Sequence, residues 1–524
     1  MPPRNIFKHS SSSQEMLSLA MDLIFWSWPA LTLALIVSVL ILSLVRRSPF
    51  RGGGSAKNGN GTCHTTNENN TVKVLPSPAR MPIIGHLYLF QGNPIIELTK
   101  LSKKYGDIYK LYLGSVETVV VNSLPLIKEV LMQKGSDFGD RPNFLRYSIL
   151  FGDNKDNSLA FCDWSSVQKT RRSLARRFCH TGLFADRVET ALQTTTDILM
   201  AHIRSDIGLG ESCPNLKLNL QKACGNIFFD FFCSKVVTEW EEDAEFDRVV
   251  KLFDDIFWEI NQSHATDVLP FLAPVFKQHL SALANMGTEI RQYVINRIIV
   301  PHAAQLDKDN PIDFVDILLT HLEEAEPKNR LTQDQVLYEL EDFLGGHCAV
   351  SNLLCRAIVE IADSPGMSDK IYVKHFEQGN KEYIQAVIYE TLRRTSSPIV
   401  PHVASCNSSI GGYPINKGTM IMINNYDLNS SHDLWERPDE FIPERFLLDG
   451  GNGRFKKPAH FFPFSYGKRA CMGYQLVEKV TEGLILAMVK NFDITPLDNP
   501  TQLPIASVAL HPNEQLRVKL TPRQ

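Results

Sequence analysis

The sequence lacks an excess of charge of either sign. Its 54 lysine and arginine residues nearly balance 58 aspartate and glutamate residues, and the formal net charge is −4. Proteins that bind the phosphates of nucleic acids usually carry a strongly basic surface. The composition therefore gives no support for a nucleic-acid partner.

The sequence also lacks the paired spacings of common metal and disulfide sites. Neither Cys-x-x-Cys nor His-x-x-x-His occurs anywhere, which disfavours a zinc site. The ten cysteines are dispersed over 524 residues, unlike the dense framework of a small secreted domain. Internal repeats are absent as well. With 44% hydrophobic residues, the chain is long enough to bury a large core.

One long hydrophobic run is present near the N-terminus. Residues 23–45 carry no charge, and this length is enough for a bilayer core that requires about 20 residues. A cleaved signal peptide has a shorter apolar region of about 7 to 15 residues and a small-residue cleavage site, which is missing here. We therefore expect a membrane anchor within residues 1–47. Basic residues are more frequent after the span than before it, which predicts a cytosolic body.

A change of composition separates this anchor from the rest of the chain. Residues 48–75 are rich in Gly, Ser, Asn and Thr and indicate a flexible linker. The segments Asn60-Gly61-Thr62 and Asn69-Asn70-Thr71 match the glycosylation pattern, but on the cytosolic side both are expected to stay unmodified. Residues 76–524 are expected to form one large domain.

The pattern of this domain is mainly helical. Residues 108–113 and 118–121 alternate on either side of Gly114-Ser115, which predicts a β-hairpin. Helical patterns follow near residues 126–133 and 164–178 and dominate from about 185 to 395. Short strands are expected after that, one of them at residues 419–424. The sequence therefore predicts a mainly α fold with a small β region.

The segment from Phe464 to Gly473, Phe-Ser-Tyr-Gly-Lys-Arg-Ala-Cys-Met-Gly, carries the strongest chemical signal. Cationic neighbours and the N–H groups at a helix start lower the pKa of a thiol, and Lys468, Arg469 and a following helical pattern are expected to supply both to Cys471. A free cysteine is often an inert buried residue, but here the surrounding spacing fits a haem-thiolate site.

The two glycines and the aromatic residue of this segment have expected roles as well. Gly467 and Gly473 let the backbone bend and approach a porphyrin without a Cβ in the way. Phe464 is expected to shield the sulfur of Cys471, and Arg469 to reach a haem propionate.

This segment matches every fixed position of the haem-binding signature of the cytochrome P450 family, which the chain resembles. Three further motifs stand upstream in the family's order: Glu390-Thr391-Leu392-Arg393, Pro443-Glu444-Arg445-Phe446, and the prolines 76, 78 and 82 before Gly85. The resemblance covers residues 76–524. It implies a P450 fold preceded by one transmembrane helix, haem b held by Cys471, and oxidation of a small apolar substrate with O₂.

The resemblance also implies partners and a location. Electrons would come from NADPH through NADPH–cytochrome P450 reductase, with cytochrome b5 as a second candidate donor. The protein would be a single-pass protein of the endoplasmic reticulum membrane with its catalytic body in the cytosol.

Glu390 and Arg393 are three residues apart, so on a helix they share a face. Most such pairs are solvated and contribute little. In the family the pair joins the arginine of the later motif, here Arg445, behind the haem. We therefore assign these three residues to a structural lock and not to the chemistry.

Two further haem contacts depart from the family pattern. Trp164 and Gln168 are four apart, and the second position usually carries an arginine that contacts a propionate. Gln168 supplies a hydrogen bond but no charge, so Lys169 or Arg172 is a candidate source of charge. His402 stands where many members have another propionate-binding arginine.

The basic helix at residues 169–177 is either a solvated face or a docking surface for an acidic electron donor.

The segment 344–352 stands where the family places its oxygen-activating helix. Members usually have an acid followed by a threonine, which relay protons; here these positions are Cys348 and Ala349. Alanine has no exchangeable proton, and a thiol is a weak donor. Gly345 and Gly346 fit a helix that opens locally to admit O₂.

Three interpretations of this segment stay open. Protons for monooxygenation come from water, His347, Ser351 or the substrate hydroxyl; or the enzyme is an isomerase or dehydratase that does not activate O₂; or the protein is a non-catalytic haem sensor. Monooxygenation is favoured, because a thiolate ligand promotes O–O cleavage.

Within the family, the segments 345–352 and 163–172 resemble the spook and spookier branch of the insect Halloween group. That resemblance implies a sterol substrate and an early step of ecdysteroid synthesis from 7-dehydrocholesterol. Apolar stretches such as residues 228–232 are expected to belong to the core and not to a substrate wall.

Overall fold

A computed structural model describes residues 73–180, 185–208, 215–237, 243–324, 330–448 and 453–523. These ranges belong to one compact unit, Thr71–Gln524. The predicted membrane span at residues 23–45 and most of the predicted linker lie outside the described residues. Within those ranges, no helix has both the length and the apolar character needed to cross a bilayer.

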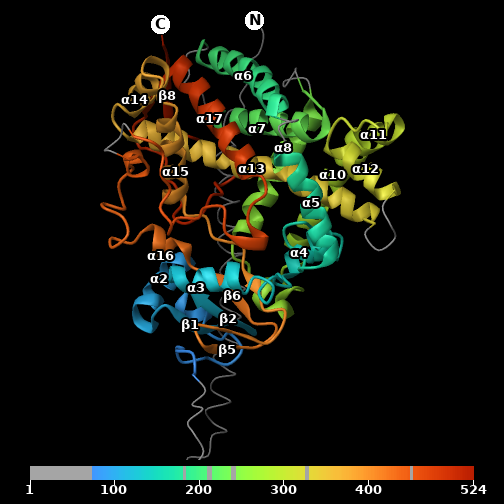
Figure 1. Cartoon of the computed structure of the whole chain (residues 1–524), viewed down its shortest axis with the longest axis vertical. Coiled ribbons are helices and arrows are strands. Elements are labelled where there is room, and N and C mark those ends of the chain that lie inside the picture. The colour runs from blue at the N-terminus through green and yellow to red at the C-terminus, as the bar shows by residue number, and fades with distance from the viewer. Residues whose placement is uncertain are drawn as a thin grey trace, which may run out of the picture. The chain divides into compact units, whose positions relative to one another are not determined.

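Most of the unit is helical, as the sequence predicts (Figure 1). The α-helices are α2 (Pro94–Tyr105), α3 (Leu124–Lys128), α4 (Leu145–Leu150), α5 (Ser166–His180), α6 (Ala185–Gly208), α7 (Leu216–Cys233), α8 (Ala244–Asn261), α9 (Ala265–Val268), α10 (Lys277–Val294), α11 (Val300–Gln305), α12 (Phe314–Glu324), α13 (Gln333–Asp363), α14 (Met367–Tyr372), α15 (Glu382–Thr395), α16 (Asn425–Asn429) and α17 (Tyr474–Asn491). Short 3₁₀ or π turns used below are η2 (Glu129–Gln133), η8 (Pro443–Phe446) and η10 (Gly467–Arg469).

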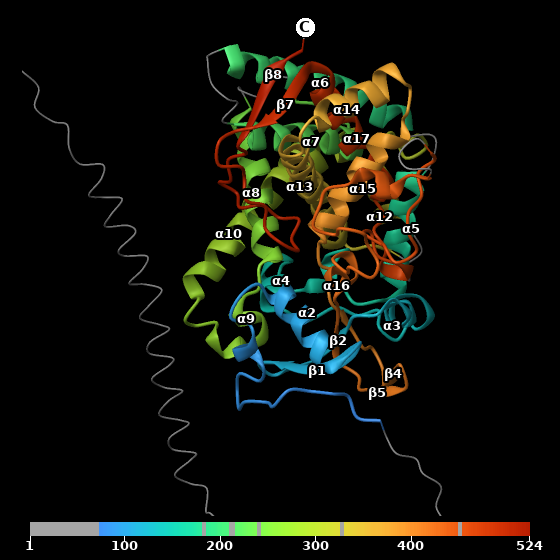
Figure 2. The same cartoon turned by 90° about the vertical axis from the view of Figure 1, so that its left-hand side faces the viewer.

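The strands are short and form small sheets. They are β1 (Ile108–Leu113), β2 (Val116–Val121), β3 (His402–Val403), β4 (Ser408–Ile410), β5 (Tyr413–Ile415), β6 (Met420–Ile423), β7 (Phe492–Pro496) and β8 (Val518–Pro522). The predicted hairpin is confirmed, because β1 and β2 pair antiparallel from Ile108↔Val121 to Leu113↔Val116. The four-stranded sheet has the order β1-β2-β6-β3, in which β2 and β6 run parallel. This sheet lies at one end of the unit, and α6, α7, β7 and β8 lie at the other (Figures 1 and 2).

Helix α13 organises the helical part. It begins with a capping box, in which the Thr332 hydroxyl accepts from the Gln335 N–H and the Gln335 side chain accepts from the Thr332 N–H. Over 31 residues it packs against α7, α8, α15 and α17. Because one helix contacts so many others, a residue on one side of α13 lies in a different environment from a residue on the other side.

A cluster of phenylalanine rings fills the core between α5, α7, α12 and α13. Phe178 lies 5.2 Å from Phe314, and Phe232 lies 4.9 Å from Phe343, measured between ring centroids. Residues 228–232 contribute four buried phenyl rings, so the prediction that this stretch belongs to the core is confirmed. Complete burial of each ring stabilises the fold by roughly 1.5–3 kcal/mol.

Candidate functional site

The segment that carries Cys471 is a tight loop in front of α17. The turn η10 is followed by a hydrogen bond from the Cys471 N–H to the Phe464 carbonyl at 2.9 Å, and Gly473 is the N-cap of α17. Cys471 is accessible, yet the protein surrounds it closely enough that burial raises the pKa of its thiol. The Gly473 N–H and Arg172 act in the opposite direction.

The cation beside Cys471 differs from the sequence-based expectation. Lys468 donates to the Ser136 hydroxyl and Arg469 donates to the Gly139 carbonyl, so neither is directed at the thiol. Arg172 of α5 donates to the Ala470 carbonyl at 2.5 Å and is the positive charge that lowers the pKa of Cys471. The prediction that Lys468 and Arg469 do so was wrong, because the loop turns their side chains towards residues 136–139.

The two glycines of the loop have different roles. Gly467 has φ of +72°, and a Cβ there would lie 2.0 Å from the carbonyl oxygen of Leu131 in η2. The neighbouring segment at Leu131 therefore requires a glycine at position 467, while the approach of a porphyrin to this glycine stays a prediction. At Gly473 a Cβ would meet no protein atom within 4 Å, so the backbone next to Cys471 is open to a bound group.

Three buried nitrogen-bearing side chains gather near this loop. Arg469 donates through Nε and Nη2 to the Gly139 carbonyl and through Nη2 to the Cys162 carbonyl at 2.6 Å, but its Nη1 has no partner. His402 Nδ1 donates to the Phe138 carbonyl at 2.7 Å, and its Nε2 has no partner.

Arg141 is the third member, and no motif in the sequence pointed to it. Its side chain donates to the carbonyls of Ala160, Val400 and Pro401 and to no carboxylate. Burial, together with the charge of Arg469, lowers the pKa of Arg141 to about 9. Burial and the two arginines lower the pKa of His402 to about 3, although the Phe138 carbonyl acts to raise it.

The chemistry of this donor set matches haem. Buried polar atoms are nearly always hydrogen-bonded, so the unpartnered Nη1 of Arg469, beside a second buried cation, Arg141, fits an anionic group such as a propionate. The unpartnered Nε2 of His402 would donate to such a group once protonated, which a nearby negative charge favours. An accessible thiol and the open backbone at Gly473 fit the iron and the ring. Haem bound here supplies the activation of O₂; the protein supplies its ligand, its charge partners and its orientation.

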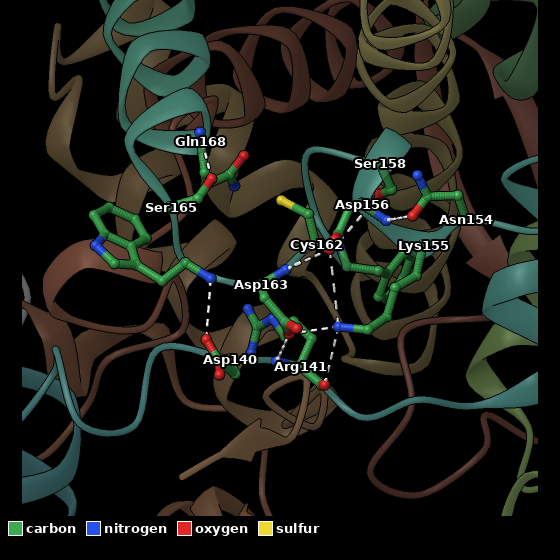
Figure 3. Close-up of polar contacts among 12 residues, drawn as sticks. Asp140, Arg141, Asn154, Lys155, Asp156, Ser158, Cys162, Asp163, Ser165 and Gln168 are labelled. Atoms are coloured by element: carbon green, nitrogen blue, oxygen red, sulfur yellow. Dashed lines mark hydrogen bonds and ion pairs between the residues drawn. The ribbon is translucent and has the colours of Figure 1, made fainter. Parts of the chain in front are cut away.

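Figure 3 shows how the segment before α5 is fixed. The Trp164 N–H donates to Asp140 at 3.2 Å, and the Arg141 N–H donates to Asp163 at 3.0 Å (Figure 3). Lys155 also donates to Asp163. The Trp164 ring lies 5.4 Å from the guanidinium of Arg469. These contacts hold the backbone on which Arg141 stands and place the Trp164 ring beside Arg469.

Gln168 has a different partner from the one expected. Its amide nitrogen donates to the Leu159 carbonyl at 2.6 Å, while its Oε1 has no partner. Of the two candidate sources of charge near this position, Arg172 is buried and Lys169 is exposed. The basic residues of α5 are likewise split between buried and exposed positions. Arg171 is buried in an ion pair with Glu339. Lys169, Arg176 and Arg177 stay exposed.

Helix α13 is continuous from Gln333 to Asp363, so the predicted local opening at Gly345 and Gly346 is wrong. A Cβ at Gly345 would lie 3.2 Å from the Phe253 ring, and a Cβ at Gly346 would lie 3.3 Å from the Phe228 ring. The two glycines therefore let phenyl rings of α8 and α7 pack closely against an intact helix.

The candidate proton donors lie on the packed side of α13. His347, Cys348 and Ser351 are fully buried. The His347 ring donates through Nδ1 to the Leu344 carbonyl at 2.6 Å and packs edge-on against Phe253 at 5.5 Å. Burial lowers the pKa of His347 to about 4.

Ser351 also forms a hydrogen bond within α13, in which its hydroxyl donates to the Cys348 carbonyl at 3.1 Å. The partly accessible positions of this stretch are Gly345, Gly346 and Ala349. The structure therefore does not bring His347 or Ser351 to the accessible face, against the expectation that they supply protons.

Glu390, Arg393 and Arg445 form one buried cluster. Arg393 donates to both oxygens of Glu390 at 2.8 Å, and Arg445 Nε donates to Glu390 Oε1 at 3.0 Å. Arg393 also donates to the Asn429 and Pro438 carbonyls. The cluster joins α15 to η8 and to the chain between them.

Comparison with known proteins agrees with this geometry. The family described as "Cytochrome P450" matches residues 75–520. The chain belongs to the cytochrome P450 family. Members of this family bind haem b through a cysteine thiolate and are monooxygenases, so the predicted cofactor and enzyme class are confirmed.

Individual relatives are consistent with this family. "Cytochrome P450 307a1" of Drosophila melanogaster is 37% identical over 492 residues, which cover 86% of this chain and 89% of that protein. "Steroid 17-alpha-hydroxylase/17,20 lyase" of Ictalurus punctatus is 29% identical and covers 77% and 82%. A solved zebra fish cytochrome P450 with progesterone has a TM-score of 0.71 and 25% identity, covering 83% of this chain and 100% of that chain. The insect relative agrees with the predicted resemblance to the Halloween group.

Proposed function

We propose that this P450 is a sterol monooxygenase of ecdysteroid synthesis that acts at an early step from 7-dehydrocholesterol. The observation that carries the proposal is the 37% identity to an insect P450 over 86% of the chain. A steroid hydroxylase is also among the relatives, and the similar solved structure is a complex with progesterone. The last two relations favour a rigid polycyclic substrate.

The exposed face of α13 supports an apolar substrate of this shape. Gly345, Gly346 and Ala349 are the partly accessible residues, and none has a polar side chain. Phenyl rings occupy the space beside the two glycines, so the small side chain of Ala349 is the one that would offer an apolar surface to a substrate of this kind. Cys471 would ligate the iron, while Arg469, Arg141 and His402 would hold the propionates.

Proton supply must differ from the usual acid and threonine relay. Because His347 and Ser351 are buried and hydrogen-bonded within α13, we assign the protons to water or to the substrate's own hydroxyl group. Electrons would come from NADPH through a reductase, with cytochrome b5 as a second donor. The enzyme would be anchored in the endoplasmic reticulum membrane by residues 23–45.

The test uses the full-length protein with its reductase in microsomes, supplied with NADPH, ¹⁸O₂ and 7-dehydrocholesterol. We expect O₂ uptake in step with a sterol product that carries ¹⁸O, and no product from Cys471→Ser. Oxidation of other apolar compounds but not of this sterol would overturn the substrate assignment.

A second function, isomerisation or dehydration without O₂, is favoured by one observation, the absence of an acid or alcohol at Cys348 and Ala349. The same incubation separates the two. Under the second function, product forms in the absence of O₂ and NADPH and contains no ¹⁸O.

A further inference from the structure

Two histidines and a glutamate converge far along the chain from Cys471. Glu259 lies in the last turn of α8, His264 immediately precedes α9, and His279 lies in the first turn of α10. Figure 2 shows α9 near one end of α10. The three side chains each bring a potential ligand atom within 4.8 Å of the others. Three consecutive segments therefore meet at one point.

The histidine pair has a geometry suited to ligation. The rings of His264 and His279 stack with centroids 4.9 Å apart and planes 8° apart. His279 Nε2 is 2.9 Å from Glu259 Oε1. His264 Nδ1 lies 2.7 Å from the Thr266 hydroxyl and also accepts from the Thr266 N–H at 3.3 Å, whereas Nε2 forms no hydrogen bond with any described residue.

This partner of His264 is the kind that metal-binding histidines use. A ligating imidazole usually donates its second N–H to an oxygen, which fixes the ring and leaves the other nitrogen for the metal. In the tautomer whose Nδ1–H donates to the Thr266 hydroxyl, which is the shorter of the two Thr266 contacts, the lone pair of Nε2 is free. Phe276 packs against the ring at 4.9 Å and restricts it further.

The local charge also suits a cation. Arg146 lies 3.0 Å from Glu259, but it forms a closer pair with Asp267 at 2.7 Å. The two carboxylates and the one guanidinium leave one negative charge beside two imidazoles. Glu259 stands at the end of α8, where the carbonyl ends of the helix dipole favour positive charge.

A second group of similar composition lacks these properties. In the group of His302, Asp313 and Asp316, His302 is bonded through both ring nitrogens, to the Ile298 carbonyl and to Asp313. Asp313 also accepts from Ser234 at 2.6 Å. No histidine nitrogen is left for a metal in this group, in contrast to Nε2 of His264, so the group is a closed hydrogen-bond network.

We propose that Glu259, His264 and His279 bind one Zn²⁺ ion that ties the end of α8 to the start of α10. Two imidazoles and a carboxylate are a known zinc donor set, completed by water as a fourth ligand. Imidazole ligands disfavour Mg²⁺ and Ca²⁺, which prefer oxygen. His279 is exposed, so the ion can reach the site from solvent.

The test is a calorimetric titration of the tag-free, full-length haem protein with zinc chloride after removal of metal by a chelator. We expect one Zn²⁺ per chain in the micromolar range or tighter, and binding at least tenfold weaker in His264→Gln and His279→Gln. His432→Gln, a change at an exposed histidine outside the group, should bind as the parent does.

Hydrogen exchange checks the structural consequence. Zn²⁺ should slow amide exchange in residues 262–276 of the parent protein but not of His279→Gln, while both retain the same thermal unfolding midpoint without zinc. The proposal is overturned by the absence of a stoichiometric site, by equal affinity in His279→Gln, or by unchanged exchange in this segment.

Discussion

Gly467 illustrates how strongly one residue of the cysteine loop depends on a distant segment. Its backbone adopts a left-handed conformation, and the loop approaches the end of η2 so closely that no side chain fits. Left-handed backbone is costly for residues with a Cβ. The position of Cys471 is therefore linked to the contact between residues 131 and 467.

We predict that Gly467→Ala destabilises the protein by about 3 kcal/mol or more, because it combines backbone strain with a clash that only a backbone shift relieves. Thermal unfolding and the spectrum of the reduced carbon monoxide complex measure the effect. Gly473→Ala is the matched control: its φ is −87° and its Cβ meets no protein atom, so the protein should keep its stability, with any change confined to haem binding. Equal stability of both variants would contradict the prediction.

Burial of His347 predicts that the stability of the protein depends on pH. Its pKa in the folded protein is about 4, below the value of about 6.5 in an unfolded chain. Between these values the unfolded state binds the proton and the folded state does not, so stability is lost as pH falls from about 6.5 to about 4, by up to about 3 kcal/mol.

Chemical unfolding at pH 7 and pH 5 measures this loss. His347→Asn keeps a donor for the Leu344 carbonyl but does not titrate, so its stability should fall less over the same interval. An identical pH slope in the parent and in this variant would show that other groups account for the loss.

Among the elements, α13 separates two environments that its sequence does not distinguish. In the run from Gly345 to Ser351, the small residues Gly345, Gly346 and Ala349 are partly accessible and the other side chains are buried. The buried side meets Phe228 of α7 and Phe253 of α8, and this contact, not proton transfer, accounts for the glycines and for the placement of His347. The missing acid and alcohol are therefore not replaced by a neighbour on the same helix.

Features that depend on local sequence patterns could be predicted, and features that depend on distant contacts could not. The hairpin, the strand β6 and the loop of Cys471 follow local patterns in the sequence, and these expectations agree with the structure. Arg141 could not be found in this way, because its role depends on carbonyls at residues 160, 400 and 401. The roles of Gly467 and Arg172 also depend on contacts between distant segments. The periodicity of a single sequence does not reveal such contacts.

The cluster of Glu390, Arg393 and Arg445 joins α15 to η8, and its charges are buried. Removing one partner of a buried pair leaves an uncompensated charge, which costs about 3–5 kcal/mol. We predict that Arg393→Ala lowers the free energy of unfolding by that amount. Lys100→Ala, which breaks an exposed pair with Glu97, should change it by less than about 1 kcal/mol. Similar effects of the two changes in denaturant titrations would refute the assignment of a structural lock.

At the scale of the whole molecule, the chain divides into Met1–Asn70 and the compact unit Thr71–Gln524. The proposed haem contacts, the cluster of Glu390, Arg393 and Arg445, and the proposed zinc group all belong to the second unit. The apolar run at residues 23–45, by contrast, belongs to the first unit. Membrane attachment and catalysis are therefore expected to be separable.

We predict that deleting residues 1–70 leaves a protein that binds haem, gives the reduced carbon monoxide spectrum of a thiolate ligand and unfolds at the same temperature as the full chain. In cell fractions, the truncated protein should shift from the membrane pellet towards the supernatant, because an apolar run long enough to span a bilayer has been removed. The control exchanges residues 23–45 for an unrelated transmembrane segment of equal length, which should restore membrane attachment. Loss of the thiolate spectrum on truncation would mean that the first unit stabilises the second, and full retention in the pellet would mean that another part of the chain binds the membrane.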